Sequence, residues 1–225
     1  MPMHDVVTDI TALRRGVRVT VNGSNVFHLS HAELRDLPLA VGESFDWADY
    51  QQRLLLRQYP EALNRAVGLL ATRSRSTAEL TRRLTENGYL PDTIEMVLYK
   101  LEKEQLTDDA AFARAWVENR AARGMGKMRL KQELRMKGVS ETQAEEALAA
   151  VDEDTQAAQA TALAAKLCRR HRSAPVPERR RKVIMAMQRR GYRYSEAAAA
   201  LETAMTDCDA ELPAEDEDDW PNDDG

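Results

Sequence analysis

The feature that most constrains the fold of this chain is an internal repeat, present three times and anchored on glycine. In the first copy the pattern consists of Leu80, Leu84, Gly88, Leu98 and Leu101. It recurs 50 residues later as Leu130, Leu134, Gly138, Leu148 and Val151, and after a further 53 residues as Val183, Met187, Gly191, Leu201 and Ala204. Identical internal spacing at this length predicts tandem modules of one kind.

Each repeat is expected to contain three helices. The glycine ends one helix, because glycine adopts the left-handed C′ conformation at little cost. The helices that end in this way are predicted at 78–87, 127–137 and 178–190, and a third helix precedes each pair at about 61–71, 109–122 and 155–170. The helix after each glycine is expected to start at Pro91, at a capping box of Ser140 and Gln143, and around Ser195 and Glu196.

The first 45 residues have a different periodicity. Val17, Val19 and Val21 alternate with polar residues, and Asn22-Gly23 then turns the chain before a second apolar run at 26–29, which indicates a β-hairpin. Residues 10–13 are a possible third strand, and a short helix is expected around 31–37. Helical periodicity begins at Asp46, and Pro60 is expected at the first position of a second helix.

These patterns predict a mainly α protein, built from tandem repeats of a three-helix module in an elongated or curved array, with a small N-terminal β-rich lobe. Aromatic residues make up only 5% of the chain and charged residues 31%, which suits small helical cores better than a β-sandwich or barrel. The expected divisions are 1–45 (hairpin lobe), 46–59 (linking helix), 60–106, 107–152 and 153–206 (modules 1 to 3), and 207–225 (acidic disordered tail).

Several classes of protein are disfavoured. No apolar run approaches the roughly 20 residues that span a bilayer, and residues 1–10 lack the basic and apolar regions of a signal peptide. Cys168 and Cys208 are the two cysteines, too few for a disulfide framework. We therefore expect a cytoplasmic protein that does not associate with membranes.

Catalytic and metal-binding motifs are incomplete. Residues 124–127 (Gly-Met-Gly-Lys) resemble the end of a phosphate-binding loop, but the motif fails at Ala121 and Met128, so a flexible link between two helices of module 2 is expected. Cys168 and His171 have ligand spacing, yet lie among basic residues that would repel a dication.

Asp108 and Asp109 look like a carboxylate pair. They directly precede a helix, where carboxylates cap exposed N–H groups and complement the helix dipole. An acid/base pair would also need a pocket and a partner, which the sequence does not indicate. We expect no enzymatic activity, no metal and no cofactor.

Charge is distributed very unevenly. Residues 207–225 contain ten acidic residues and no basic one, whereas the other 206 residues contain 32 basic and 27 acidic residues. Two nearly single-signed basic clusters comprise Arg120, Arg123, Lys127, Arg129, Lys131, Arg135 and Lys137, and Lys166, Arg169, Arg170, Arg172, Arg179, Arg180, Arg181, Lys182, Arg189, Arg190 and Arg193. A smaller group in module 1 comprises Arg73, Arg75, Arg82 and Arg83. Arginine binds phosphates and carboxylates in bidentate fashion, so these clusters are the candidate binding surface, although a solvated helix face is the alternative.

The most specific motifs lie between residues 60 and 151. They are the run Arg75–Leu80 (R-S-T-A-E-L) with Leu84 and Gly88, the run Leu106–Asp109 (L-T-D-D) with Phe112 and Ala113, Gly124 to Gly126, Glu133-Leu134 and Lys137-Gly138. In this order they resemble the core signature of the RecX family of recombinase regulators. Module 3 and the N-terminal lobe are similar in outline only.

The resemblance implies a bacterial cytoplasmic protein that binds the RecA recombinase, chiefly as its filament on DNA, and inhibits strand exchange and the linked ATPase and co-protease activities. The setting would be DNA repair, recombination and the SOS response. It also implies that Asp108, Asp109 and Phe112 hold module 2 together, the aspartates by capping and Phe112 in the core. The expected state is a monomer that lies along the filament groove and bridges adjacent RecA subunits.

Two further hypotheses follow from the charge distribution. The chain could instead be a DNA-binding helical-repeat protein, for single- or double-stranded DNA, without a RecA target; tight, steeply salt-dependent binding to naked oligonucleotides would distinguish it. The acidic tail is either a solubilising end or a competitor for the basic surfaces, since tethering raises its effective concentration there to about the millimolar range.

Overall fold

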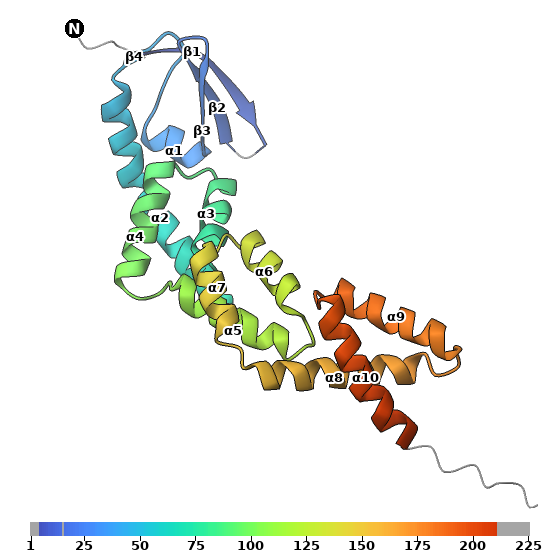
Figure 1. Ribbon diagram of the computed structural model, residues 1–225. Coiled ribbons are helices and arrows are strands. Elements are labelled where there is room, and N and C mark those ends of the chain that lie inside the picture. Colours follow the sequence, from blue (N-terminus) through green and yellow to red (C-terminus); the bar gives the residue numbers. More distant parts are fainter. Residues whose placement is uncertain (1–4, 15, 211–225) are drawn as a thin grey trace, which may run out of the picture. The chain divides into compact units, whose positions relative to one another are not determined.

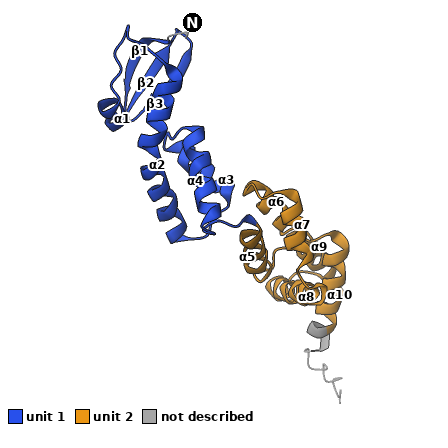
Figure 2. Cartoon of the chain, turned by 90° about the vertical axis from the view of Figure 1, so that its left-hand side faces the viewer, with its two compact units in different colours: residues 1–109 blue, residues 110–225 orange. Residues whose placement is uncertain are grey.

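The computed structural model describes residues 5–14 and 16–210 (Figure 1). The chain divides into two compact units, residues 1–109 and 110–225, each with its own cores (Figure 2). Of the predicted tail at 207–225, residues 207–210 belong to the last helix, and the rest of that prediction lies outside the described residues. None of the helices in the described ranges is long and apolar enough to cross a bilayer.

The first unit begins with an antiparallel sheet of four strands in the order β3-β2-β1-β4. The strands and the helix that follows the hairpin are β1 (Asp5–Leu13), β2 (Gly16–Val21), β3 (Asn25–Leu29), α1 (His31–Asp36) and β4 (Ser44–Phe45). The alternating valines of β2 point into the lobe, where they pack with Tyr50 and Leu54. The predicted hairpin is confirmed, with Val19 opposite Phe27, and the short β4 is a strand that the sequence patterns did not indicate.

One continuous helix, α2 (Trp47–Thr72), replaces the two helices expected on either side of Pro60. The expected helix start at Pro60 is therefore wrong, and the boundary between 59 and 60 falls inside α2. Proline deprives only the carbonyl of Leu56 of its donor, and the Leu56 side chain is exposed. The helix is retained because its first half buries Tyr50 and Leu54 in the lobe, and its second half buries Ala62 and Ala66 in the next core.

Gln58 joins the two cores of the first unit. Its side chain is 1% exposed. The amide Nε2 donates to Glu33 Oε1 at 2.7 Å, and Oε1 accepts from the backbone N–H of Leu90 at 2.9 Å and from Thr93 Oγ1 at 3.1 Å. Because a buried amide without these partners would be costly, this network holds the lobe against module 1.

Module 1 is completed by α3 (Thr77–Glu86) and α4 (Pro91–Lys103). Its core contains Leu80, Leu84 and Leu101, all fully buried, which are members of the repeat pattern. Ser76 caps α3 by accepting the N–H of Glu79 at 3.2 Å.

The second unit contains modules 2 and 3. Its helices are α5 (Asp109–Ala121), α6 (Lys127–Met136), α7 (Glu141–Ala149), α8 (Glu153–Arg170), α9 (Val176–Arg189) and α10 (Tyr194–Ala210). The repeat positions Leu130 and Leu134 are buried in one core, and Val183 and Met187 in the other. The predicted class, a mainly α protein with three tandem helical modules and a small N-terminal strand lobe, is confirmed.

The repeat glycines are confirmed at helix ends. Gly88, Gly138 and Gly191 have φ of 88°, 73° and 90°, in the left-handed region. The prediction for Ser140 is confirmed for the cap itself, since its hydroxyl accepts the N–H of Gln143 at 3.3 Å; the Gln143 side chain accepts from that hydroxyl.

Asp109 caps a helix other than the expected one. It is the first residue of α5, but its carboxylate accepts the backbone N–H of Thr77, at the start of α3, at 2.8 Å. Sequence proximity favoured α5, and only the folded first unit places the α3 terminus beside this side chain. Phe112 is buried in the module 2 core as expected and stacks on Trp116, with ring centroids 5.8 Å apart.

Candidate functional site

The basic residues of module 1 are engaged within the first unit. Arg73 makes a bidentate pair with the buried Glu79, with both N···O distances 3.0 Å. Arg82 and Arg83 lie within ion-pair distance of Glu86, and Arg75 donates to the carbonyl of Leu69 at 3.0 Å. This group is therefore a poor candidate for binding an external anion.

Glu133 organises part of the first basic cluster in the second unit. Its carboxylate is almost completely buried and accepts from Arg120 Nε at 2.8 Å, from Trp116 Nε1 at 3.1 Å and from Arg129 Nε at 3.2 Å. The Arg120 guanidinium holds the pKa of Glu133 below its usual value, although burial opposes this. Arg120 and Arg129 thus belong to an internal network that joins α5 to α6.

Trp116 lies at the edge of this network. Its half-buried ring stacks on Phe112, and Lys137 Nζ lies 4.7 Å from the ring centroid in cation–π geometry. The Arg120 guanidinium lies 5.9 Å from the same centroid. Such contacts contribute about 0.5–1 kcal/mol at exposed sites, and they orient Lys137 over the ring.

Three more of the candidate cations have carboxylate partners. Lys131 Nζ lies 2.9 Å from Glu141 and 2.8 Å from Glu145, which ties α6 to α7. Arg180 pairs with Glu202 of α10, and Lys182 pairs with Glu178 one turn earlier at 2.7 Å. Arg180 lowers the pKa of Glu202 through this hydrogen bond.

The remaining candidates form what we call the open basic surface. No carboxylate of the described ranges makes an ion pair with any of its members: Arg123, Lys127, Arg135, Lys166, Arg169, Arg170, Arg172, Arg181, Arg189, Arg190 and Arg193. Lys127 and Arg190 are half-buried and the others are exposed. Arg179 is also half-buried, and its Nε has no hydrogen-bond partner in the described part of the chain.

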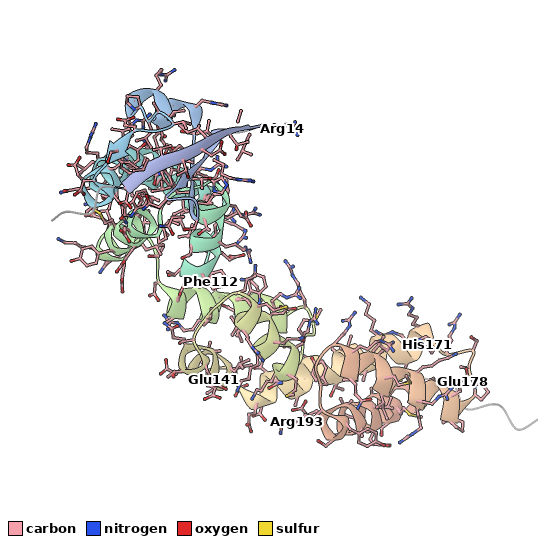
Figure 3. The ribbon with its side chains drawn as sticks, turned by 90° about the horizontal axis from the view of Figure 1, so that it is seen from above. Arg14, Phe112, Glu141, His171, Glu178 and Arg193 are labelled. Atoms are coloured by element: carbon pink, nitrogen blue, oxygen red, sulfur yellow. The ribbon has the colours of Figure 1, made fainter. Side chains whose placement is uncertain are left out.

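The open basic surface follows particular elements of the second unit. Its members lie on the link from α5 to α6, at the ends of α6 and α8, in the turn into α9, and along α9. His171 and Glu178 mark the end of the unit where α8 turns into α9, and Arg193 follows the far end of α9 (Figure 3).

The Gly124–Lys127 segment links α5 to α6 but is tied to module 3. The backbone N–H of Gly126 donates to the carbonyl of Arg190 at 2.9 Å, and that of Met128 donates to the carbonyl of Gly191 at 3.2 Å. The segment links two helices of module 2 as expected, and these bonds anchor it to the end of α9. These bonds bring Lys127, from the first basic cluster, beside the end of α9, from the second.

The chemistry available on this surface is anion binding. Guanidinium groups that form no ion pair with a described carboxylate present donors to phosphates or to carboxylates of another protein. Tyr192 is buried in the module 3 core and Tyr194 is exposed, so one tyrosine of this pair is available for stacking. Cys168 is buried in that same core, and among the described residues no three potential ligands gather as a metal site would require.

Sequence reasoning missed Glu133 and Trp116 as parts of this region. A signal existed for Glu133, which is the single acid in the run 120–137. A lone acid in a basic run has several cations within reach, but which of them it pairs with depends on helix packing.

Comparisons with known proteins agree with this architecture. Family models described as the first, second and third three-helix domains of RecX match residues 62–101, 108–148 and 154–201. A regulatory protein RecX from Levilactobacillus brevis is 31% identical over 201 residues, which cover 88% of this chain and 76% of that protein. One from Mycolicibacterium smegmatis is 36% identical over 166 residues, 71% of this chain and 88% of that protein. A crystal structure of regulatory protein RecX aligns with a TM-score of 0.61 at 25% identity, over 90% of this chain and 99% of that one.

Proposed function

Because the chain belongs to the RecX family of regulatory proteins, we propose that it binds the RecA recombinase, chiefly as its filament on DNA, and inhibits strand exchange and the linked ATPase and co-protease activities. We also propose that the protein is cytoplasmic and monomeric and that it is not an enzyme. The observation that carries it is the open basic surface, which continues across modules 2 and 3 through the backbone contact of Gly126 with Arg190.

The ion pairs within the second unit distinguish cations that can contact a partner from cations with a structural role. A cation that is already hydrogen-bonded to an internal carboxylate, such as Arg120, would have to give up that bond to engage a partner. An exposed cation that forms no ion pair with a described carboxylate, such as Arg172 or Arg189, has no such bond within the described ranges to give up. We therefore assign contact with RecA or DNA to the open basic surface and a structural role to the paired cations.

The proposed mechanism is a bias between filament states. A surface that extends over two modules can touch more than one RecA subunit, so it favours the subunit arrangement in which its cations meet acidic groups or phosphates together. A preference of about 1–3 kcal/mol, the usual size of coupling between sites, is enough to slow assembly or hydrolysis.

The direct test is the ATPase activity of RecA on single-stranded DNA with increasing amounts of this protein. We expect inhibition that saturates with the filament and weakens as salt is raised. Normal ATPase activity at every ratio of the two proteins would contradict the proposal.

A DNA-binding protein without a RecA target is the second candidate, because exposed arginines also suit phosphates. Burial of Tyr192 removes one of the two aromatic residues near the basic clusters and so disfavours base stacking. Binding to naked oligonucleotides as tight as to RecA filaments, with a steep salt dependence, would favour this candidate instead.

A further inference from the structure

An open groove of about 590 Å³ lies between α9 and α10 in the second unit. Ile184, Met185 and Tyr194 provide its apolar lining. Met185 and Tyr194 are 50% and 63% exposed, which is high for large apolar side chains on helices that pack against each other. Neighbouring apolar groups exposed in a concave surface indicate a place where another segment can be buried.

The rim of this groove is basic. Arg180 and Arg181 line it together with a single acid, Glu202, and Arg180 neutralises that acid by pairing with it. Arg181 makes no ion pair with a described carboxylate, and the exposed Arg193 directly precedes Tyr194.

Charge distinguishes this groove from three others. The groove between α8 and α10 is lined by Lys127 but also by Glu153, Asp154 and Glu196. A third, beside α5, is lined by one base and two acids, and a fourth, on the N-terminal lobe, has a single charged residue, Asp5. Of these four, the α9–α10 groove alone has more bases than acids, so it suits an acidic segment with an apolar anchor.

The chain itself contains such a segment directly after α10. Residues 211–225 comprise eight acidic residues and no basic one, and among them stand Leu212 and Trp220. Because α10 forms one wall of the groove and ends at Ala210, the segment is tethered to the groove that it complements.

We propose that residues 211–225 dock into the α9–α10 groove of their own chain, with Trp220 against Met185 and Tyr194 and the acidic residues beside Arg181 and Arg193. The tether is long enough. From Ala210 back to the level of Tyr194 is about 24 Å along the helix, whereas the ten residues 211–220 reach roughly 33 Å when extended. The effective concentration of a segment on so short a tether is about millimolar.

When docked in this way, the acidic segment competes with external polyanions for the basic residues around the groove. It covers Arg181 and neighbouring members of the open basic surface, so a polyanionic partner must displace it before these cations become available. This inference concerns the contact of the segment with its own chain, and its test contains no recombinase. Its failure would therefore leave the proposed function unaffected.

The test uses the full chain labelled with 5-fluorotryptophan and ¹⁹F NMR. Three resonances are expected, from Trp47, Trp116 and Trp220, and Trp220→Phe identifies the third. We expect the Trp220 resonance to be displaced from that of a labelled 211–225 peptide. It should return to the peptide position in Met185→Asp, in Arg181→Glu, and on raising salt from about 0.1 to 1 M, which shortens the Debye length from roughly 10 to 3 Å.

The matched control is Met136→Asp on α6, where the methionine is also exposed, at 60%, but lies outside this groove. This variant should leave the Trp220 resonance unchanged. Circular dichroism checks that all variants keep their helices. A Trp220 resonance at the peptide position in the unmodified protein would overturn the proposal, as would a displacement that depends on protein concentration.

Discussion

Gly126 and Gly191 meet backbone to backbone, and no side chain fits between them. A Cβ atom on Gly126 would lie 2.4 Å from the carbonyl oxygen of Gly191, and a Cβ atom on Gly191 would lie 2.3 Å from the backbone nitrogen of Arg129. The first glycine immediately precedes α6 of module 2, and the second ends α9 of module 3. The two modules of the second unit are therefore joined through peptide groups in direct contact.

Gly126→Ala is expected to weaken this contact. The backbone of Gly126 has φ of -78°, which alanine adopts freely, so the effect comes from the steric clash alone. Overpacking of this kind costs about 1–3 kcal/mol. Hydrogen exchange measured by mass spectrometry should show faster exchange in α6 and α9. Gly68→Ala is the control, because Gly68 lies in α2 with nothing within 4 Å of the added Cβ; it should leave α6 and α9 unchanged.

Comparing Gly191→Ala with Gly88→Ala distinguishes the effect of backbone strain on stability from the effect of a steric clash. The two glycines occupy equivalent helix ends with φ of 90° and 88°, so both substitutions incur the left-handed penalty of about 1–2 kcal/mol. Only the Cβ on Gly191 meets another backbone. We therefore expect a larger loss of unfolding free energy for Gly191→Ala in denaturant titrations. Equal losses would show that the close approach contributes nothing.

Glu133→Gln should destabilise the second unit. The substitution keeps the size of the side chain but leaves Arg120, itself only 26% exposed in its side chain, without its counter-charge. Removing one partner of a largely buried pair typically costs about 3–5 kcal/mol, and the partial exposure here reduces the expectation to about 1–3 kcal/mol. Glu141→Gln removes a fully exposed carboxylate from Lys131 and is the control, for which no measurable change is expected.

The stabilisation that Glu133 provides is expected to depend on pH. The folded-state pKa of Glu133 is lowered, chiefly by Arg120, so its contribution to stability is complete above the unfolded pKa and is lost as pH falls through the folded pKa. The difference in unfolding free energy between the unmodified protein and Glu133→Gln should be constant from about pH 7 to 5 and should shrink below pH 4.5, the ordinary value for glutamate. A difference that grows on acidification would contradict the ion-pair assignment.

Substitutions on the open basic surface should weaken binding to RecA filaments. Arg172→Ala with Arg189→Ala removes two exposed cations without disturbing an ion pair between described residues. Each lost charge-assisted contact is worth about 1.5–3 kcal/mol, so affinity should fall roughly tenfold or more, with a shallower salt dependence. The control, Lys131→Ala, removes a cation already held by Glu141 and Glu145. A larger loss for the control would reverse the assignment of contact and structural roles.

Local patterns were sufficient for much of the fold. The glycines at 88, 138 and 191 were predicted at helix ends and have the expected backbone conformation. The apolar positions that define the repeat are largely buried. Both outcomes depend on residues close together in the sequence, where helical periodicity and the freedom of glycine decide the conformation.

The wrong predictions concern positions where a contact with a segment distant in the sequence determines the structure. Pro60 lies inside α2 because the lobe and module 1 both bury faces of that one helix. Asp109 caps α3 because Thr77, 32 residues earlier, is brought beside it.

For the candidate site, the sequence alone determined that modules 2 and 3 carry nearly all of the clustered positive charge. Which of those cations are available was decided only by tertiary structure. Glu133 engages Arg120 and Arg129, whereas Arg172 and Arg189 are left without a described ion pair. The physical reason is that composition specifies how many charges a helix carries, while the packing of one helix against another determines which of them lie within a hydrogen bond of an opposite charge.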